Sequence, residues 1–222
     1  MKPNKPAGEN RQPANHHTEQ ITKVYTMRDW KEYAGESLLI VFSVLLALIL
    51  TEYISNLHQK SETKELLENI KQELITNKQV ETEQLAYNLK VLKSIDSALA
   101  DPERQKKIVN HDEFHLENIA PDGVLHLYLE DVAWVVAKNH NISSKISLNT
   151  VKKLTHIYQD QAKIMKIEDE IAKVIFSPES RKQQNAHQTL MLIRDNYKGW
   201  AVDRAPGLLQ QYNEAIKLLD EK

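Results

Sequence analysis

The feature that most constrains this chain is an apolar run, residues 37–51, which contains no charged side chain and lies between Glu36 and Glu52. A helix rises about 1.5 Å per residue, so the run alone covers about 22 Å. The hydrocarbon core of a bilayer is roughly 30 Å thick. The uncharged neighbours 33–35 and 53–54 close most of the gap and leave the two glutamates near the interfaces. The sequence therefore predicts one membrane-spanning helix.

Two other structures share such a run: the core helix of a soluble protein and the apolar centre of a cleaved signal peptide. A core helix normally keeps a polar stripe; this run has none, although the mean hydropathy of the whole chain is -0.53. A signal peptide begins with a short basic segment and ends at small residues. Here a long polar stretch precedes the run, and residues 50–56 read Leu-Thr-Glu-Tyr-Ile-Ser-Asn. The sequence therefore favours an uncleaved membrane anchor over a core helix and over a cleaved signal peptide.

Lysine and arginine are unequally distributed around the span, and this bias predicts its orientation. Residues 52–75 contain three lysines among five glutamates. Six basic residues precede the span: Lys2, Lys5, Arg11, Lys23, Arg28 and Lys31. We therefore expect a single-pass protein of the inner (cytoplasmic) membrane, with the N-terminus inside and the C-terminal domain in the periplasm. The lipid bilayer is its first expected partner.

The same features divide the chain into three parts. Residues 1–26 hold three prolines among polar residues and are predicted to be a disordered cytosolic tail. Residues 27–55 form the transmembrane anchor with an interfacial lead-in. Residues 56–222 form an exterior α-helical domain, long enough to bury a core.

The composition favours helices and excludes several kinds of site. Five Gly and seven Pro in 222 residues are few, and the absence of Cys excludes disulfides, thiolate metal sites and cysteine nucleophiles. A formal net charge of -2 gives no sign of nucleic-acid binding. The predicted fold is all-α: an N-terminal transmembrane helix continuing into a long stalk helix, then a helical bundle.

The predicted stalk, residues 52–99, carries two apolar stripes that are out of phase with each other. The first contains Leu67, Ile70, Leu74 and Asn77. The second contains Leu85, Leu89, Leu92, Ile95 and Leu99, and the offset resembles a coiled-coil stutter. An Asn at a seam position can set register. The pattern fits both a coiled coil between chains and a bundle helix within one chain.

Four or so helices are predicted to pack after the stalk. Asp101-Pro102-Glu103 predicts a helix start, and residues 110–123 a polar break. A helix over 124–138 is expected to bury Leu125, Leu129, Val132 and Val136, with Trp134 and Val135 beside them, before a loop at 140–144.

The last third of the chain has the strongest helical periodicity. A helix is predicted over 148–176, the next from Ser177-Pro178 to Tyr197 with its end at Lys198-Gly199, and the last after Pro206-Gly207. The expected buried residues are Leu154, Ile157, Ile164, Ile167, Ile171 and Val174 in the first helix, Ala186, Leu190 and Ile193 in the second, and Leu208, Leu209, Tyr212, Ile216 and Leu219 in the third.

Catalytic and metal-binding motifs were sought along the whole sequence. His111 and His115 would share a helix face, as metal ligands do, but they lie in the least helical segment and do not form an HExxH pair. Asp131 near Trp134 is a weak indication of a pocket. No P-loop, G-x-S-x-G or G-x-G-x-x-G motif is present. We therefore assign no catalytic, cofactor-binding or metal-binding residue and no cofactor, and expect no enzyme.

Several segments resemble a family of uncharacterised bacterial single-pass membrane proteins, a domain of unknown function. The matching pieces lie between Arg28 and Tyr158: the anchor at 33–48, the polar helix at 64–77, Ala133-Trp134, and Leu154-Thr-His-Ile-Tyr158. The resemblance implies an N-terminal anchor and a helical exterior domain, and it implies no reaction.

Two functions follow as hypotheses. The first is a non-enzymatic, membrane-anchored helical domain acting in protein–protein interaction or assembly, either as a homo-oligomer or with another membrane protein. The alternative is an exterior ligand-sensing bundle that signals through a partner. An enzyme built on the segment from His111 to His115 is a distant third.

Overall fold

The computed structural model describes residues 30–220, without the side chain of Glu32, and it confirms the all-α prediction. The predicted tail at 1–26 lies outside the described residues, as does the beginning of the lead-in at residue 27. The chain divides into two units, 1–53 and 54–222.

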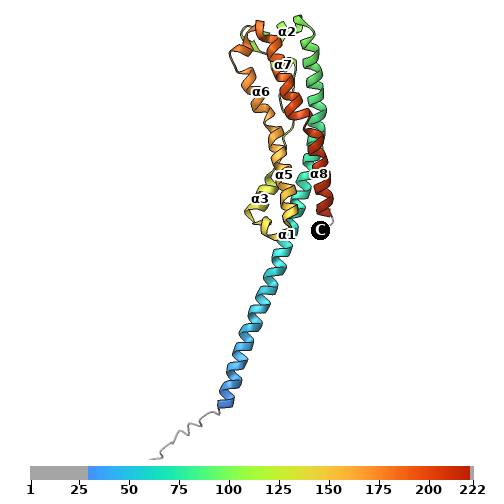
Figure 1. Ribbon diagram of the computed structural model, residues 1–222. Helices are drawn as coiled ribbons and strands as arrows, with labels where there is room; N and C mark the ends of the chain where they lie inside the picture. The colour runs from blue at the N-terminus through green and yellow to red at the C-terminus, as the bar shows by residue number, and fades with distance from the viewer. Residues whose placement is uncertain (1–29, 221–222) are drawn as a thin grey trace, which may run out of the picture. The chain divides into compact units, whose positions relative to one another are not determined.

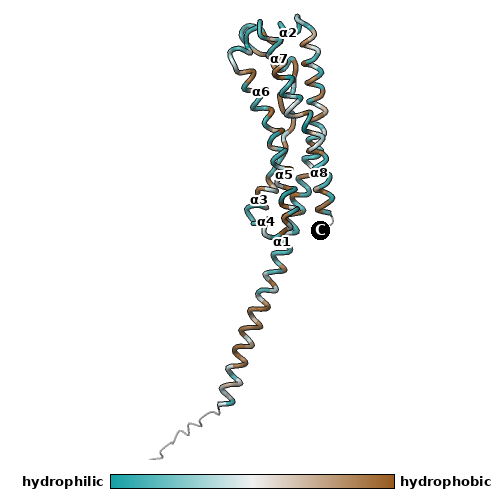
Figure 2. The backbone as a smooth tube through the Cα atoms, in the orientation of Figure 1, coloured by the Kyte–Doolittle hydropathy of each residue, from teal (hydrophilic) through white to brown (hydrophobic). Residues whose placement is uncertain are grey.

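The described part of the first unit, residues 30–53, is helical and mostly apolar. It contains the beginning of α1 (Trp30–Leu99), whose apolar stretch appears as continuous brown in Figure 2. No residue of this stretch is buried, and Leu38 is 72% exposed, so the core-helix alternative is wrong. The hydroxyls of Ser43 and Thr51 donate hydrogen bonds to the carbonyls of Leu39 and Ala47, each at 2.8 Å, so both are satisfied within the helix itself. Within the described residues, α1 is the one helix long and apolar enough to cross a membrane.

The second unit is a bundle of the remainder of α1 with seven further α-helices and short connecting elements (Figure 1). The helix α5 lies beside α8, and α6 beside α7. The helices are α2 (Pro102–Ile108), α3 (Val132–Asn139), α4 (Ile142–Lys145), α5 (Leu148–Met165), α6 (Ile167–Ile175), α7 (Ala186–Asn196) and α8 (Ala205–Asp220). The short elements are the antiparallel pair β1 (Val109–Asn110) and β2 (Glu113–Phe114), the 3-10 turns η1 (Leu116–Asn118), η2 (Glu179–Arg181) and η3 (Gln183–Asn185), and the π-helix η4 (Tyr197–Val202).

The bundle has two apolar clusters, one at each end of the buried part of α1. The first joins Leu66, Ile70 and Leu74 of α1 to α3, α5 and α8. The second joins Val91 and Ile95 of α1 to α2, α6, α7 and η4. Most residues predicted to be buried in the last three helices lie in these clusters, so the helical phase predicted there is confirmed.

The buried face of α1 follows an unbroken seven-residue repeat. The buried positions of this repeat alternate in steps of four and three: Ile70, Leu74, Asn77, Glu81, Gln84, Asn88, Val91, Ile95 and Ala98. The predicted stutter is therefore wrong, and Leu89 is half exposed. The error arose because the four central positions are polar, and apolar spacing alone could not follow the repeat through them. Ile70 and Leu74 are fully buried within their own chain, so this part of α1 is a bundle helix.

The helix predicted over 124–138 is wrong in its first half. Residues 124–131 contain no helix, and α3 begins only at Val132. Val132 and Val136 are 63% and 42% exposed, whereas Trp134 is buried. The reason lies in α1, whose polar side chains bind the backbone of this segment, as described below.

Other helix boundaries differ by local breaks. The helix predicted over 148–176 is divided at Lys166, where α6 starts with three acidic residues in its first turn, as the helix dipole favours. Residues 142–145 form α4 where a loop was predicted, and α7 starts only at Ala186. Gly199 lies inside η4, where Asp203 N–H donates to the Lys198 carbonyl, and so does not end the helix. Pro206-Gly207 lies in the first turn of α8, where the lost N–H of Pro costs no hydrogen bond.

Candidate functional site

The two apolar clusters are separated by polar side chains on one face of α1. We call Glu73, Asn77, Glu81, Gln84 and Tyr87 the polar stripe. All five are at most 9% exposed. Four of them hold residues 122–133, which we call the extended segment, and the partners run in reverse order along the chain. The segment is therefore antiparallel to α1.

At one end of the polar stripe, Tyr87 and Gln84 bind the start of the extended segment. The Tyr87 hydroxyl accepts from the Asp122 N–H at 3.2 Å and donates to the Gly123 carbonyl at 2.7 Å. The Gln84 Oε1 accepts the N–H groups of both His126 and Leu127, at 3.0 and 2.9 Å. These side chains take the place of a neighbouring strand, because buried backbone groups need partners.

At the other end, Asn77 and Glu73 bind the segment where it enters α3. The Asn77 side chain accepts from the Glu130 N–H at 2.9 Å and donates to the Glu130 carbonyl at 2.6 Å. The Glu73 carboxylate accepts from the Ala133 N–H and from the Tyr158 hydroxyl, both at 2.6 Å. These bonds fix the first turn of α3 against α1.

Helices α5 and α8 complete the network around Asn77. Gln161 donates to the Glu130 carbonyl at 2.7 Å and accepts from the Tyr212 hydroxyl at 2.9 Å. Burial raises the pKa of the Tyr158 and Tyr212 hydroxyls well above their usual range, so both remain donors. Trp134 stacks on Tyr158, with ring centroids 5.5 Å apart and planes at 1°.

Glu81 is the one member of the polar stripe without a hydrogen-bond partner among the described residues. Both carboxyl oxygens are buried and unbonded, and the residue is 1% exposed. Burial raises the pKa of this carboxyl to about 7. A buried carboxyl of this kind titrates near neutral pH, which is often a property of functional groups and also of isolated core carboxyls.

The weak pocket indication at Asp131 has a structural counterpart. Asp131, Tyr158 and Gln161 line a cavity of about 330 Å³ beside the extended segment. Trp134 does not line it and packs in the core instead. The cavity therefore borders the Asn77 network rather than an aromatic site.

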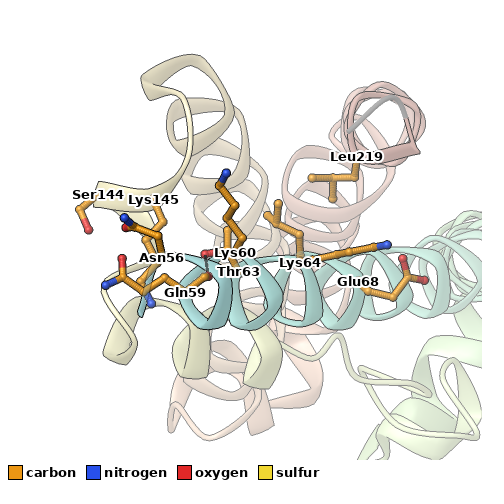
Figure 3. Close-up of a pocket in the computed structure, with 10 residues that line it drawn as sticks. Asn56, Gln59, Lys60, Thr63, Lys64, Glu68, Ser144, Lys145 and Leu219 are labelled. Carbon is orange, nitrogen blue, oxygen red and sulfur yellow. Dashed lines mark hydrogen bonds between the residues drawn. The ribbon is translucent and has the colours of Figure 1, made fainter. Parts of the chain in front are cut away.

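A larger groove lies on the first turns of α1 in the bundle. Figure 3 shows Asn56, Gln59, Lys60 and Lys64 following one another along α1, with α4 at one end of the groove and Leu219 nearer the other. The groove has a volume of about 580 Å³. Its lining residues are Asn56, Gln59, Lys60, Thr63, Lys64, Leu67, Glu68, Ser144, Lys145 and Leu219. It combines cationic, hydroxyl and amide groups with one carboxylate and two apolar side chains, Leu67 and Leu219.

An exposed valine face forms the outer side of α3. Val132, Val135 and Val136 are 63%, 38% and 42% exposed. Val132 and Val136 also line a cavity of about 310 Å³ between α3 and the side chains of Leu66 and Asn69 on α1. The bundle exposes other large apolar side chains as well, such as Leu148 at 67% and Phe176 at 68%, but these three valines share one face of a short helix.

The histidine segment does not form the ligand pair considered above. His111 and Asp112 both have positive φ, 47° and 59°, and make the two-residue turn between β1 and β2. The His115 ring lies 3.0 Å from Asn110 Oδ1 and 3.1 Å from Glu117 Oε1. Within residues 30–220, no group of three or more His, Cys, Asp or Glu side chains could hold a metal ion.

Comparison of the chain with models of known protein families, with curated proteins and with solved structures finds no match. The sequence had indicated only one member of the polar stripe, Asn77, through its seam position. The others were hidden because Glu and Gln are ordinary residues on solvated helix faces.

Proposed function

We propose that this protein is a membrane-anchored, non-enzymatic helical bundle that acts by binding another protein through the valine face of α3. The exposure of Val132, Val135 and Val136 carries the proposal. Helices of soluble domains normally turn such residues inward, and contiguous exposed apolar surface marks interaction sites. The polar stripe supports it, because Glu73 and Asn77 fix the first turn of α3 and so present the face rigidly.

A partner with an apolar strip fits this surface. A photo-crosslinking residue at Val136, in the full chain in native membranes, is expected to give one adduct of defined mass. The same residue at exposed Lys152, on α5, is the matched control and should give none. The identified partner, once purified, should bind the wild-type chain and not Val132→Asp. A partner that binds both equally contradicts the proposal.

The topology belongs to the same proposal. We infer an uncleaved anchor in the inner membrane, with the N-terminus inside and the bundle in the periplasm, from the basic bias before the span. A reporter active only outside the cytoplasm should be active after Lys222 and silent at Gln20. The reverse pattern would contradict the orientation. Membership of the single-pass family named above is part of this proposal.

A ligand-sensing bundle is the second candidate. It is supported by the groove along Asn56 to Lys64, whose size and mixed lining suit a small polar ligand. Signal output would then need a partner, which the valine face could supply. A ligand that binds the groove and changes crosslinking at Val136 would favour sensing over simple assembly.

A further inference from the structure

The membrane-proximal groove has a chemistry of its own. Seven of its lining residues lie on one face of α1, at spacings of three and four. Lys60 and Lys64 are both exposed, and Figure 3 shows Lys60 extending away from α1 and Lys64 running along it in the direction of Glu68. Neither ammonium makes an ion pair or hydrogen bond with any residue of the described range 30–220. They are therefore two cations on the rim of a groove, four residues apart.

The other cation of the groove is already neutralised. The Lys145 Nζ lies 2.8 Å from Glu62 Oε2, and His140 contacts the other oxygen of the same carboxylate at 2.7 Å. Lys145 and then His140 lower the pKa of Glu62, which keeps this carboxylate ionised. Glu68, the one acid in the lining, is occupied by Gln72 at 2.8 Å and Lys71 at 3.7 Å. Two unpaired positive charges remain to attract an anion.

The chain itself limits the distance of the groove from the apolar run. Asn56 and Lys60 follow Ile54 by two and six residues. A chain extends by at most about 3.6 Å per residue, so Lys60 lies within about 22 Å of Ile54. If α1 spans a bilayer, as proposed above, this distance reaches the headgroup layer. The apolar side chains of Leu67 and Leu219 in the lining then suit the first carbons of an acyl chain or glycerol backbone.

We propose that this groove binds the anionic, phosphate-bearing headgroup of a membrane lipid from the leaflet at which the bundle emerges. Lys60 and Lys64 supply the charge, since lysine binds phosphate as a point charge. Thr63 and Ser144 supply hydroxyl groups at the same groove. The inference depends on the proposed membrane anchoring and gives the anchored domain a preference for acidic lipid.

The test uses the full chain reconstituted in nanodiscs containing equal amounts of phosphatidylglycerol and phosphatidylcholine. After extraction into detergent, native mass spectrometry counts the lipids that remain bound. Wild type should retain phosphatidylglycerol preferentially. Lys60→Gln/Lys64→Gln should lose the preference, at about fivefold in affinity per lysine. Lys90→Gln/Lys93→Gln, which changes two exposed lysines further along α1, should keep it.

Each outcome decides the proposal. Equal retention of the two lipids by wild type, or equal loss in both double variants, overturns it. Competition by 10 mM inorganic phosphate as effective as added lipid also overturns it, because the site would then bind free phosphate. Insertion into the nanodisc is measured separately. A chain that does not insert contradicts the anchoring and this proposal together, whereas insertion without lipid preference overturns this proposal alone.

Discussion

Two stretches of the same helix reverse the usual relation between hydropathy and burial. Residues 37–51 are apolar or hydroxyl-bearing and exposed, whereas the polar stripe from Glu73 to Tyr87 is buried. In the first, none of the apolar side chains is buried by the part of the chain that the structure describes, and the proposed bilayer would supply the apolar medium that they lack. In the second, polar side chains replace water as partners for the extended segment. Burial in this protein therefore follows hydrogen-bond satisfaction as well as hydropathy.

The difference also explains why the bundle has two apolar clusters. A stretch of apolar residues could pack against any neighbouring apolar helix. The side-chain oxygens of Asn77 and Gln84, in contrast, accept hydrogen bonds from backbone N–H groups at fixed positions of the extended segment. Buried polar groups of this kind specify which segment packs where. The polar stripe thus fixes the extended segment, and the apolar clusters on either side supply most of the stabilisation.

The largest loss of stability is expected from a charge placed in the second apolar cluster, which contains Val91 and Ile95 of α1. Ile171 of α6 is fully buried, and Ile171→Asp leaves an unpaired carboxylate among apolar side chains. We expect at least about 4 kcal/mol loss of unfolding free energy, measured by chemical denaturation of the full chain in detergent. Lys166→Asp, at an exposed position, is the control and should change stability by less than about 0.5 kcal/mol. Equal effects would contradict the assigned packing.

A pH-dependent effect is expected from Glu81. Its pKa is raised from 4.5 to about 7 by burial, so the folded state binds this proton more tightly than the unfolded state. The stability that it contributes is complete below about pH 4.5, falls as the pH rises to about 7, and then levels off. The total fall is about 3 kcal/mol, at roughly 1.4 kcal/mol per pH unit.

Glu81→Gln removes the titrating group, so the fall in unfolding free energy between pH 5 and pH 8 should shrink by about 2.5 kcal/mol, the part of the total that lies in this window. Glu83→Gln changes an exposed carboxylate two residues away and should leave the pH profile unchanged. If the unfolding free energies of wild type and Glu81→Gln change in parallel with pH, the prediction is wrong. Glu81 then has a partner in solution that keeps it ionised at pH 5.

The apolar stretch is tested by a charge at its centre. Leu45→Arg costs roughly 2.5–3.5 kcal/mol for insertion of a spanning helix. We expect the variant to move from the membrane pellet to the soluble fraction or to be degraded, whereas Leu45→Phe should remain in the membrane. A Leu45→Arg chain that pellets as wild type under carbonate extraction would exclude the span.

Prediction from the sequence reached the all-α fold, the long apolar helix near the N-terminus and the buried faces of α5 to α8, because these depend on hydrophobic spacing, which a single helix displays by itself. It failed at the extended segment, since Val124 to Val136 has helical spacing and nothing local shows that Gln84 and Asn77 will bind its backbone. It failed at the groove for the same reason. Lys60 and Lys64 are adjacent on α1, but Leu219 and Ser144 come from distant parts of the chain.

The smallest effect gives the sharpest test of the comparison. Asn77→Leu makes the polar stripe more apolar and gives α1 a continuous apolar seam. If hydropathy alone decided burial, the change would stabilise the bundle. The structure predicts the opposite, because the Glu130 N–H loses its acceptor and its carbonyl keeps only Gln161. A buried donor without a partner costs about 1–3 kcal/mol, and the added apolar burial offsets part of it.

We expect Asn77→Leu to lower the unfolding free energy by about 1–2 kcal/mol and to speed exchange of the amide hydrogens in the extended segment. Thr76→Leu, at the neighbouring exposed position, adds similar apolar area without touching the network and should leave both quantities nearly unchanged. Hydrogen exchange separates the two outcomes. If only the amides around Glu130 lose their protection from exchange, the side chain of Asn77 held that backbone in the wild type. An Asn77→Leu variant that is more stable than wild type, with exchange unaltered, would mean that the polar stripe is a tolerated feature of the core and not what fixes the extended segment.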